Sequence, residues 1–271
     1  MALVRTAFMA AAAAAMAWNT GTRLALWKPA SLWIRSLAGS CSLLCNFYAL
    51  PRLPIADTST LTNLYPLWIV LATALLARRS PTLAEWLGVL SGVLGIFLLQ
   101  RPELEGDRLA MLVALGSSVS TCVAMLGLHK LRGVSPRAVV AHFGAVGAIV
   151  AGAVVSTRPA SIWSAFLDPM TLALLLAVGI SGTIGQAFLT RAYASGAPSR
   201  IAAIGLSQVA FAMILDVLIW GRTLPPITLL GFALVLGPTA WLTARGGRKA
   251  PDSIDETARS VNSPGSATVA S

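Results

Sequence analysis

Long, continuously apolar runs recur along the whole chain, and they limit what it can fold into. A helix needs about 20 mostly apolar residues to cross a bilayer. Nine windows meet that description, at 2–18, 33–50, 58–77, 84–100, 109–128, 138–156, 170–190, 201–220 and 226–244. The runs do not alternate with polar residues as barrel strands do, so they predict helices. Charged residues make up 11% of the chain, against about 25% in soluble domains. The sequence therefore predicts an all-α polytopic membrane protein.

Few charged side chains fall inside these windows. Arg5, Arg35 and Glu85 stand near predicted helix starts, where a long side chain can reach the lipid headgroups. Asp216 lies deeper, in the window 201–220. A carboxylate in hydrocarbon is costly, which makes Asp216 the candidate for an ion-coupling site. The alternative is an interfacial carboxylate that pairs with Arg222 or another nearby base.

The 20 lysines and arginines divide unevenly between the two ends of the predicted spans. Most of them, including Arg78, Arg79 and Arg245, fall on one side, which the positive-inside rule assigns to the cytoplasm. The carboxyl terminus is then cytoplasmic, and the expected location is the inner cell membrane. Nucleic acid is not an expected partner, because the basic residues are scattered over short loops.

The chain repeats itself at an offset near 143 residues. A Tyr-Ala pair followed by Pro occurs at 48–54 and again at 193–198, and a Leu-Gly pair occurs at 87–88 and 230–231. The last four windows then pair with the first four, and 109–128 has no mate. The unit is five helices, and because five is odd the second copy is inverted, as in many secondary transporters.

Three segments follow from this repeat. The expected organisation is a first repeat over 1–102 that lacks its first helix, a second repeat over 103–245, and a disordered cytoplasmic tail over 246–271. The first 20 residues admit a second interpretation, because Arg5, the alanine-rich run and Ala15-Met16-Ala17 could form a cleaved signal peptide. Cleavage would leave eight spans and break the pairing, so a true span is preferred.

Local patterns predict helix packing and a helix end. The rows Gly88-x-x-x-Gly92 and Gly144-x-x-Gly147 predict close approach of neighbouring helices. Asp57 stands just before the window 58–77, where a short side chain can cap the first turn.

Two ordered sets of segments carry a family resemblance. In the first half they are 47–57, Tyr65-Pro66 and 83–102, and in the second half Gly185-Gln186, 191–193 and 207–221. Together they resemble the EamA family of the drug/metabolite transporter superfamily. The resemblance implies the ten-helix fold of a carrier for small metabolites or exported compounds, often coupled to an ion gradient. The Gly-Glu pair frequent in that family is absent, since its places read 77–79 (Ala-Arg-Arg) and 221–222 (Gly-Arg), so no role is transferred from that glutamate.

Polar and aromatic side chains inside the spans are the candidate solute contacts. They are Asn46, Asn63, Tyr65, Trp68, Gln186 and Gln208. Amides offer donors and acceptors without a charge, and ordinary hydrogen bonds between helices are the alternative role. Pro66 predicts a kink beside the two aromatic residues, which would form either a hinge with a stacking wall or a packed bend. The resemblance places the cavity between spans 33–50, 58–77, 170–190 and 201–220.

The predicted function is a secondary active transporter that moves a small metabolite or drug-like solute by alternating access. The alternatives are a truncated relative that transports nothing and a membrane-embedded enzyme. The sequence has no His-Glu-x-x-His motif, no paired intramembrane carboxylates and no Ser-His constellation, so no catalytic residue, cofactor or metal site is expected. The expected partners are a small-molecule solute, the lipid bilayer and a coupling proton or cation, with a homodimer as a possible assembly.

Overall fold

The computed structural model describes residues 2–19, 30–76, 81–104, 106–131, 133–157, 168–221 and 225–246. Ala77, Arg78, Arg79, Arg222 and 247–271, on which some of the sequence predictions fall, lie outside these ranges. Helices make up most of the described residues, which contain no strand. In chain order the helices are α1 (Ala2–Asn19), α2 (Ala30–Ala49), α3 (Ile55–Thr62), α4 (Tyr65–Leu76), α5 (Leu83–Gln100), α6 (Arg108–His129), α7 (Pro136–Ser156), α8 (Pro169–Ser195), α9 (Pro198–Gly205), α10 (Ser207–Trp220) and α11 (Pro226–Gly246).

Each predicted span coincides with one helix or with two short helices in series. The window 58–77 is broken into α3 and α4, and the window 201–220 into α9 and α10. Among the described residues, α5, α6, α7, α8, α11 and the α9–α10 pair are long and apolar enough to cross a membrane. Three predicted spans are not in this group. The apolar part of α1 is shorter, α2 carries several polar side chains, and the first broken pair is interrupted between α3 and α4. The prediction of an all-α polytopic membrane protein is confirmed.

The outer surface of the bundle is strongly apolar. Only 17% of the most apolar stretch of α8 is buried inside the protein, and Phe188 on that helix is 64% exposed. On α10, Leu218 and Trp220 are 74% and 70% exposed. Water would not tolerate an apolar surface of this extent on a monomer, whereas the hydrocarbon of a bilayer would cover it.

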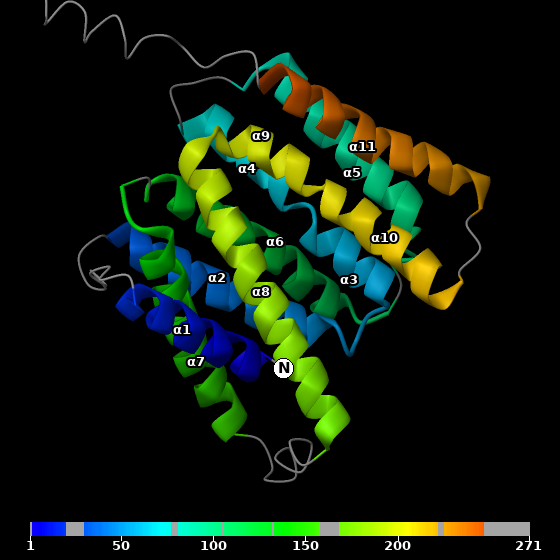
Figure 1. Ribbon diagram of the computed structural model, residues 1–271. Helices are drawn as coiled ribbons and strands as arrows, with labels where there is room; N and C mark the ends of the chain where they lie inside the picture. The colour runs from blue at the N-terminus through cyan, green and yellow to red at the C-terminus, as the bar shows by residue number, and fades with distance from the viewer. Residues whose placement is uncertain are drawn as a thin grey trace, which may run out of the picture.

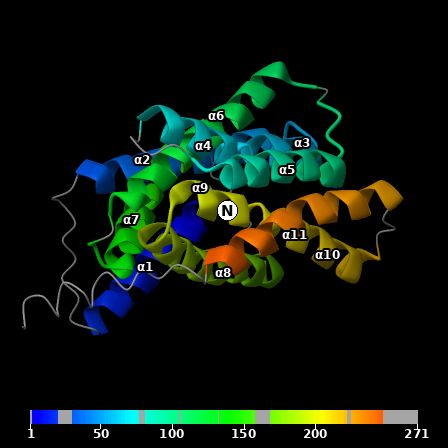
Figure 2. The ribbon, with the colours of Figure 1, turned by 90° about the horizontal axis from the view of Figure 1, so that it is seen from above.

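Two of the helix pairs that the predicted repeat relates lie side by side. The offset near 143 relates α1 to α7 and α5 to α11, and both pairs are in contact. Figure 1 shows α5 along α11 at one end of the bundle and α1 along α7 at the other, and Figure 2 shows the first of these pairs stacked when seen from above. The unmated α6 packs against α2.

The main chains of α5 and α11 approach each other closely. A Cβ on Gly95 would lie 2.9 Å from the carbonyl oxygen of Gly231, and a Cβ on Gly231 would lie 3.0 Å from that of Gly95. Such distances are too short for a carbon–oxygen contact, so the absence of both side chains lets the helices pack this tightly.

The predicted close packing at the glycine rows is also confirmed. A Cβ on Gly144 of α7 would lie 2.5 Å from the main-chain nitrogen of Ala10 on α1. On α5, a Cβ on Gly92 would lie 2.5 Å from a methyl carbon of Leu206. The absence of a side chain at these glycines therefore lets α7 pack closely on α1, and Leu206 pack closely on α5.

Asp57 does not cap a helix, and that prediction is wrong. The helix α3 begins at Ile55, which places Asp57 inside its first turn rather than ahead of it. The fully buried carboxylate accepts the main-chain N–H of Glu103 at 2.9 Å and that of Leu104 at 3.1 Å. Arg101 and Leu104 have φ values of 47° and 53°, so Asp57 fastens a segment with left-handed backbone onto α3.

Candidate functional site: a polar cavity beside two broken helices

A cavity of about 500 Å³ lies among helices of both halves of the chain. That volume suits a small organic molecule. The four expected spans all contribute, and α1, α6 and α7 add to them. The lining residues include Arg5, Thr6, Met9, Arg35, Ser42, Leu43, Asn46, Thr58, Ser59, Thr62, Asn63, Tyr65, Thr121, Met125, Phe143, Gln186, Leu189 and Gln208.

Most of the predicted solute contacts come together around this cavity. Asn46, Asn63, Tyr65, Gln186 and Gln208 are all in its lining, although they come from four helices and the turn between α3 and α4. Their role in binding stays a prediction, because a lining position is compatible with solute contact and with hydrogen bonding between helices.

Asn63 and Gln208 connect the two helix breaks. The first break lies at Asn63 and Leu64 and the second at Leu206, so that Asn63 and Leu206 are 143 residues apart, a separation equal to the predicted repeat offset. The Gln208 amide donates from Nε2 to Asn63 Oδ1 at 2.8 Å. Asn63 Nδ2 donates in turn to the Ser59 carbonyl oxygen at 2.8 Å, which also accepts the main-chain N–H of Asn63 at 3.0 Å.

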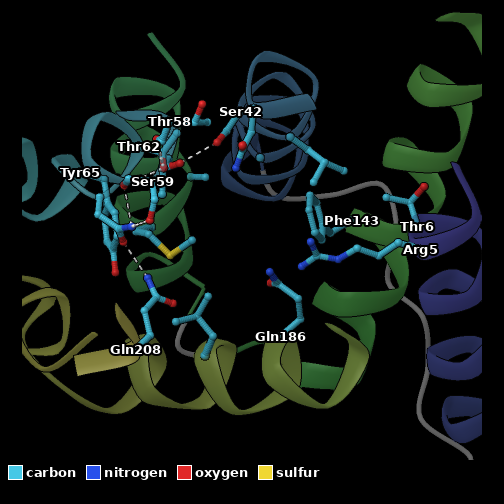
Figure 3. Close-up of a pocket in the computed structure, with 18 of the residues that line it drawn as sticks. Arg5, Thr6, Ser42, Thr58, Ser59, Thr62, Tyr65, Phe143, Gln186 and Gln208 are labelled. Carbon is cyan, nitrogen blue, oxygen red and sulfur yellow. Dashed lines mark hydrogen bonds between the residues drawn. The ribbon is translucent and has the colours of Figure 1, made fainter. Parts of the chain in front are cut away.

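The opposite side of the cavity is cationic. The side chain of Arg35 is only 1% exposed, and its Nη2 donates to Gln186 Oε1 at 2.9 Å. Its guanidinium carbon lies 4.3 Å from the centre of the Phe143 ring. Arg5 is half-buried and reaches α8 one turn earlier, where a Cβ on Gly182 would lie 2.8 Å from its Nε. In Figure 3, Arg5, Phe143 and Gln186 face the cavity from one side, and Ser59, Thr62 and Gln208 from the other.

The two arginines correct a prediction. Neither extends along the lipid surface towards the headgroups: both line the cavity. The helix α2 begins at Ala30, three residues before the predicted window, so Arg35 lies in its second turn and is covered by neighbouring helices. The signal in the sequence was the presence of two arginines in apolar windows that hold no acidic residue, 2–18 and 33–50.

Glu85 has a structural role at the start of α5. Its main-chain N–H donates to Thr82 Oγ1 at 3.3 Å, and its carboxylate accepts the N–H of Thr82 at 2.9 Å. This reciprocal pair is a capping box, which stabilises the first turn of a helix.

Trp68 and Asp216 lie outside the lining of the cavity. The indole Nε1 of Trp68 donates to Ser118 Oγ at 2.9 Å, and its ring packs against a buried cluster that contains Tyr65 and Ile69. Asp216 lies on α10 eight residues beyond Gln208, which is about 12 Å along the helix axis. The coupling role of Asp216 stays a prediction.

These features define a class of protein. A helical bundle with an apolar exterior, a cavity lined by polar side chains between its helices and paired broken helices is the architecture of a multi-pass membrane transporter. The profile of the EamA-like transporter family matches residues 1–101. The pseudopaline exporter CntI of Pseudomonas aeruginosa is 30% identical over 211 residues, which cover 76% of this chain and 72% of the exporter. The chain belongs to the EamA-like transporter family.

Other similar proteins agree with this assignment. An uncharacterized transporter of Helicobacter pylori is 23% identical, over 76% of this chain and 70% of its own length. The probable transporter vicT of Bipolaris victoriae is 24% identical, over 75% and 63% respectively. One crystal structure superposes with a TM-score of 0.76 over 92% of this chain and 88% of its own, at 21% identity, which shows the shared fold. The relatives are named as transporters, which points away from an enzyme.

Proposed function

We propose that the chain is a secondary active transporter that moves a small metabolite or drug-like solute across the inner membrane by alternating access, with its carboxyl terminus in the cytoplasm. The observation that carries this proposal is the contact between the two helix breaks, through Asn63 and Gln208, beside a cavity of about 500 Å³. Secondary transporters build their solute sites from discontinuous helices at the interface of inverted repeats. The name of the Pseudomonas relative supports export as the direction of transport.

The breaks supply the mobility that alternating access needs. At each one the regular hydrogen bonding of a helix is interrupted, so α3 can tilt relative to α4 and α9 relative to α10. Rocking of one repeat against the other would then open the cavity to one side of the membrane and close it to the other. The amide contact between Asn63 and Gln208 lies where the two moving units meet.

The test follows the accessibility of a cavity position from each side of the membrane. Cys41, Cys45 and Cys122 are first replaced by alanine, and Leu189→Cys then introduces a single thiol in the cavity lining. A membrane-impermeant thiol reagent is applied to right-side-out and to inverted vesicles. The matched control is Leu112→Cys, since Leu112 is 67% exposed on the apolar exterior of α6.

Alternating access predicts that the L189C thiol is labelled in both kinds of vesicle and the L112C thiol in neither. Labelling of L189C from one side only, or from no side, in a variant that purifies as a folded protein would overturn the proposal.

A further inference from the structure

We infer that the cavity takes an organic anion and that a carboxylate of this solute binds at Arg35, with Arg5 as the second cation. The inference rests on the proposed function, because it names the class of solute that would be transported.

The charge balance of the cavity is the first argument. Two arginines contribute to the described lining, and none of the lining residues is acidic. Arg35 is almost completely buried, and its recorded contacts in the described part of the chain are an amide and an aromatic ring rather than a carboxylate. A buried cation without an anionic partner is costly. An anion that enters the cavity would therefore bind favourably, because its charge would offset that of the buried guanidinium.

The hydrogen bonds of Arg35 are the second argument. Gln186 offers one carbonyl oxygen, which Nη2 of Arg35 uses. The buried Nε of Arg35 has no acceptor among the described residues. A carboxylate carries two oxygens in one plane and accepts two parallel hydrogen bonds from a guanidinium, whereas an amide oxygen satisfies a single donor.

The guanidinium of Arg35 is held in place before a solute arrives. The ring of Phe143 supports one of its faces by a cation–π contact of 4.3 Å. Its side chain passes between two glycines, because a Cβ on Gly39 would collide with Nη1, and a Cβ on Gly127 would lie 3.3 Å from the Arg35 Cβ. A fixed guanidinium loses little further freedom when it binds an anion.

Arg5 adds a second positive charge at the same end of the cavity. It contacts α8 at Gly182, and Arg35 contacts α8 at Gln186, which are four residues and therefore about 6 Å apart along the helix. The far end of the cavity carries hydroxyls and amides, and Leu43 and Leu189 supply apolar walls. This combination suits an organic molecule with an acidic end and a polar end rather than a cation.

The first experiment measures the charge preference of the cavity without knowledge of the solute. In the cysteine-free protein that carries Leu189→Cys, the rate of reaction with an anionic methanethiosulfonate reagent (sulfonatoethyl) is divided by the rate with a cationic one (trimethylammonium-ethyl). The reference is Thr157→Cys, at the exposed end of α7. We expect this rate ratio to be about tenfold higher at position 189, since a confined field of one sign concentrates counter-ions by that order.

Three arginine variants identify the source of the preference. Arg35→Gln and Arg5→Gln should each reduce the rate ratio at position 189 severalfold. Arg52→Gln should leave it unchanged, because Arg52 is exposed and stacks on Tyr48 outside the cavity. Equal ratios at positions 189 and 157, or a ratio that Arg35→Gln does not alter, would overturn the inference.

The second experiment tests the carboxylate itself. Glutarate should slow the labelling of L189C, while the size-matched neutral diamide glutaramide should not. Arg35→Lys keeps the charge but loses the planar fork, so it should retain most of the rate ratio and lose the protection by glutarate. Equal protection by the diamide, protection by glycerol phosphate alone, or no protection by either anion would overturn the assignment of a carboxylate.

The outcomes separate this inference from the proposed function. Two-sided labelling of L189C without a charge preference leaves the transporter proposal standing and removes the anion site. A strong charge preference with labelling from one side only does the reverse.

Discussion

Asp57 carries the sharpest stability prediction. Its buried carboxylate accepts two main-chain N–H groups, from Glu103 and Leu104. A hydrogen bond to a charged group contributes about 1.5–3 kcal/mol, so Asp57→Ala should lower the free energy of unfolding by about 3–6 kcal/mol. Asp57→Asn keeps one acceptor oxygen, so it should lower the free energy of unfolding by about half as much as Asp57→Ala. For a chain of this size 1 kcal/mol corresponds to about 2–4 °C, so D57A should lower the Tm by on the order of 10 °C.

The assay follows thermal unfolding of the purified protein in detergent through the reaction of the buried Cys122 thiol with a fluorogenic reagent. The matched control is Asp107→Ala. Asp107 also accepts two main-chain N–H groups, from Leu109 and Ala110, but it is an exposed helix cap, whose loss costs about 1 kcal/mol. Equal Tm losses for D57A and D107A would refute the argument that burial and the fastening of a left-handed segment make Asp57 the stronger of the two.

Three further predictions use other parts of the molecule. Gly144→Val should lower the Tm strongly, because its Cβ would lie 2.5 Å from the Ala10 nitrogen, while Gly152→Val on the same helix should be close to neutral, since its nearest neighbour would be 3.8 Å away. Hydrogen bonds from the Thr171 hydroxyl and N–H lower the pKa of Asp168 below its ordinary value of 3.8, so this cap stabilises fully at neutral pH and is lost as the pH falls through the lowered pKa. As the pH falls below about 4, the free energy of unfolding should therefore fall more in the parent protein than in Asp168→Asn. Finally, Asp216→Asn should remove the pH dependence of transport in vesicles if Asp216 couples protons; unchanged transport and unchanged pH dependence would exclude that role.

The apolar windows and the repeat could be predicted from the sequence because both depend on local composition and spacing. The prediction of a kink at Pro66 was close, since the first break lies at Asn63 and Leu64, just before Tyr65. The second break follows Gly205 and has no proline within it. A Cβ on Gly205 would lie 2.7 Å from the hydroxyl of Tyr65, so Gly205 is in close contact with a residue 140 positions earlier in the sequence. A local sequence pattern cannot predict a contact between residues so far apart.

The direction of the arginine side chains could not be predicted for a similar reason. A window of mean hydropathy locates a helix but does not say which of its faces turns inward. Arg35 faces the cavity because α6, α7 and α8 cover that side of α2, through Gly127, Phe143 and Gln186. The inward direction of the amide side chains was easier to predict, since a polar uncharged side chain in a span needs a hydrogen-bonding partner, which only the inner surface offers.

The contact between Gly95 and Gly231 restricts how this protein can evolve. A methyl group on either residue would meet the carbonyl oxygen of the other, and every amino acid carries that oxygen. A substitution at one position therefore has no compensating substitution at the other, because glycine is already the smallest residue. In an ordinary core pair, a larger side chain at one position can be offset by a smaller one at the other, but these two glycines allow no such exchange. Descendants of this chain must keep both glycines or separate the two helices and re-form the interface from other residues.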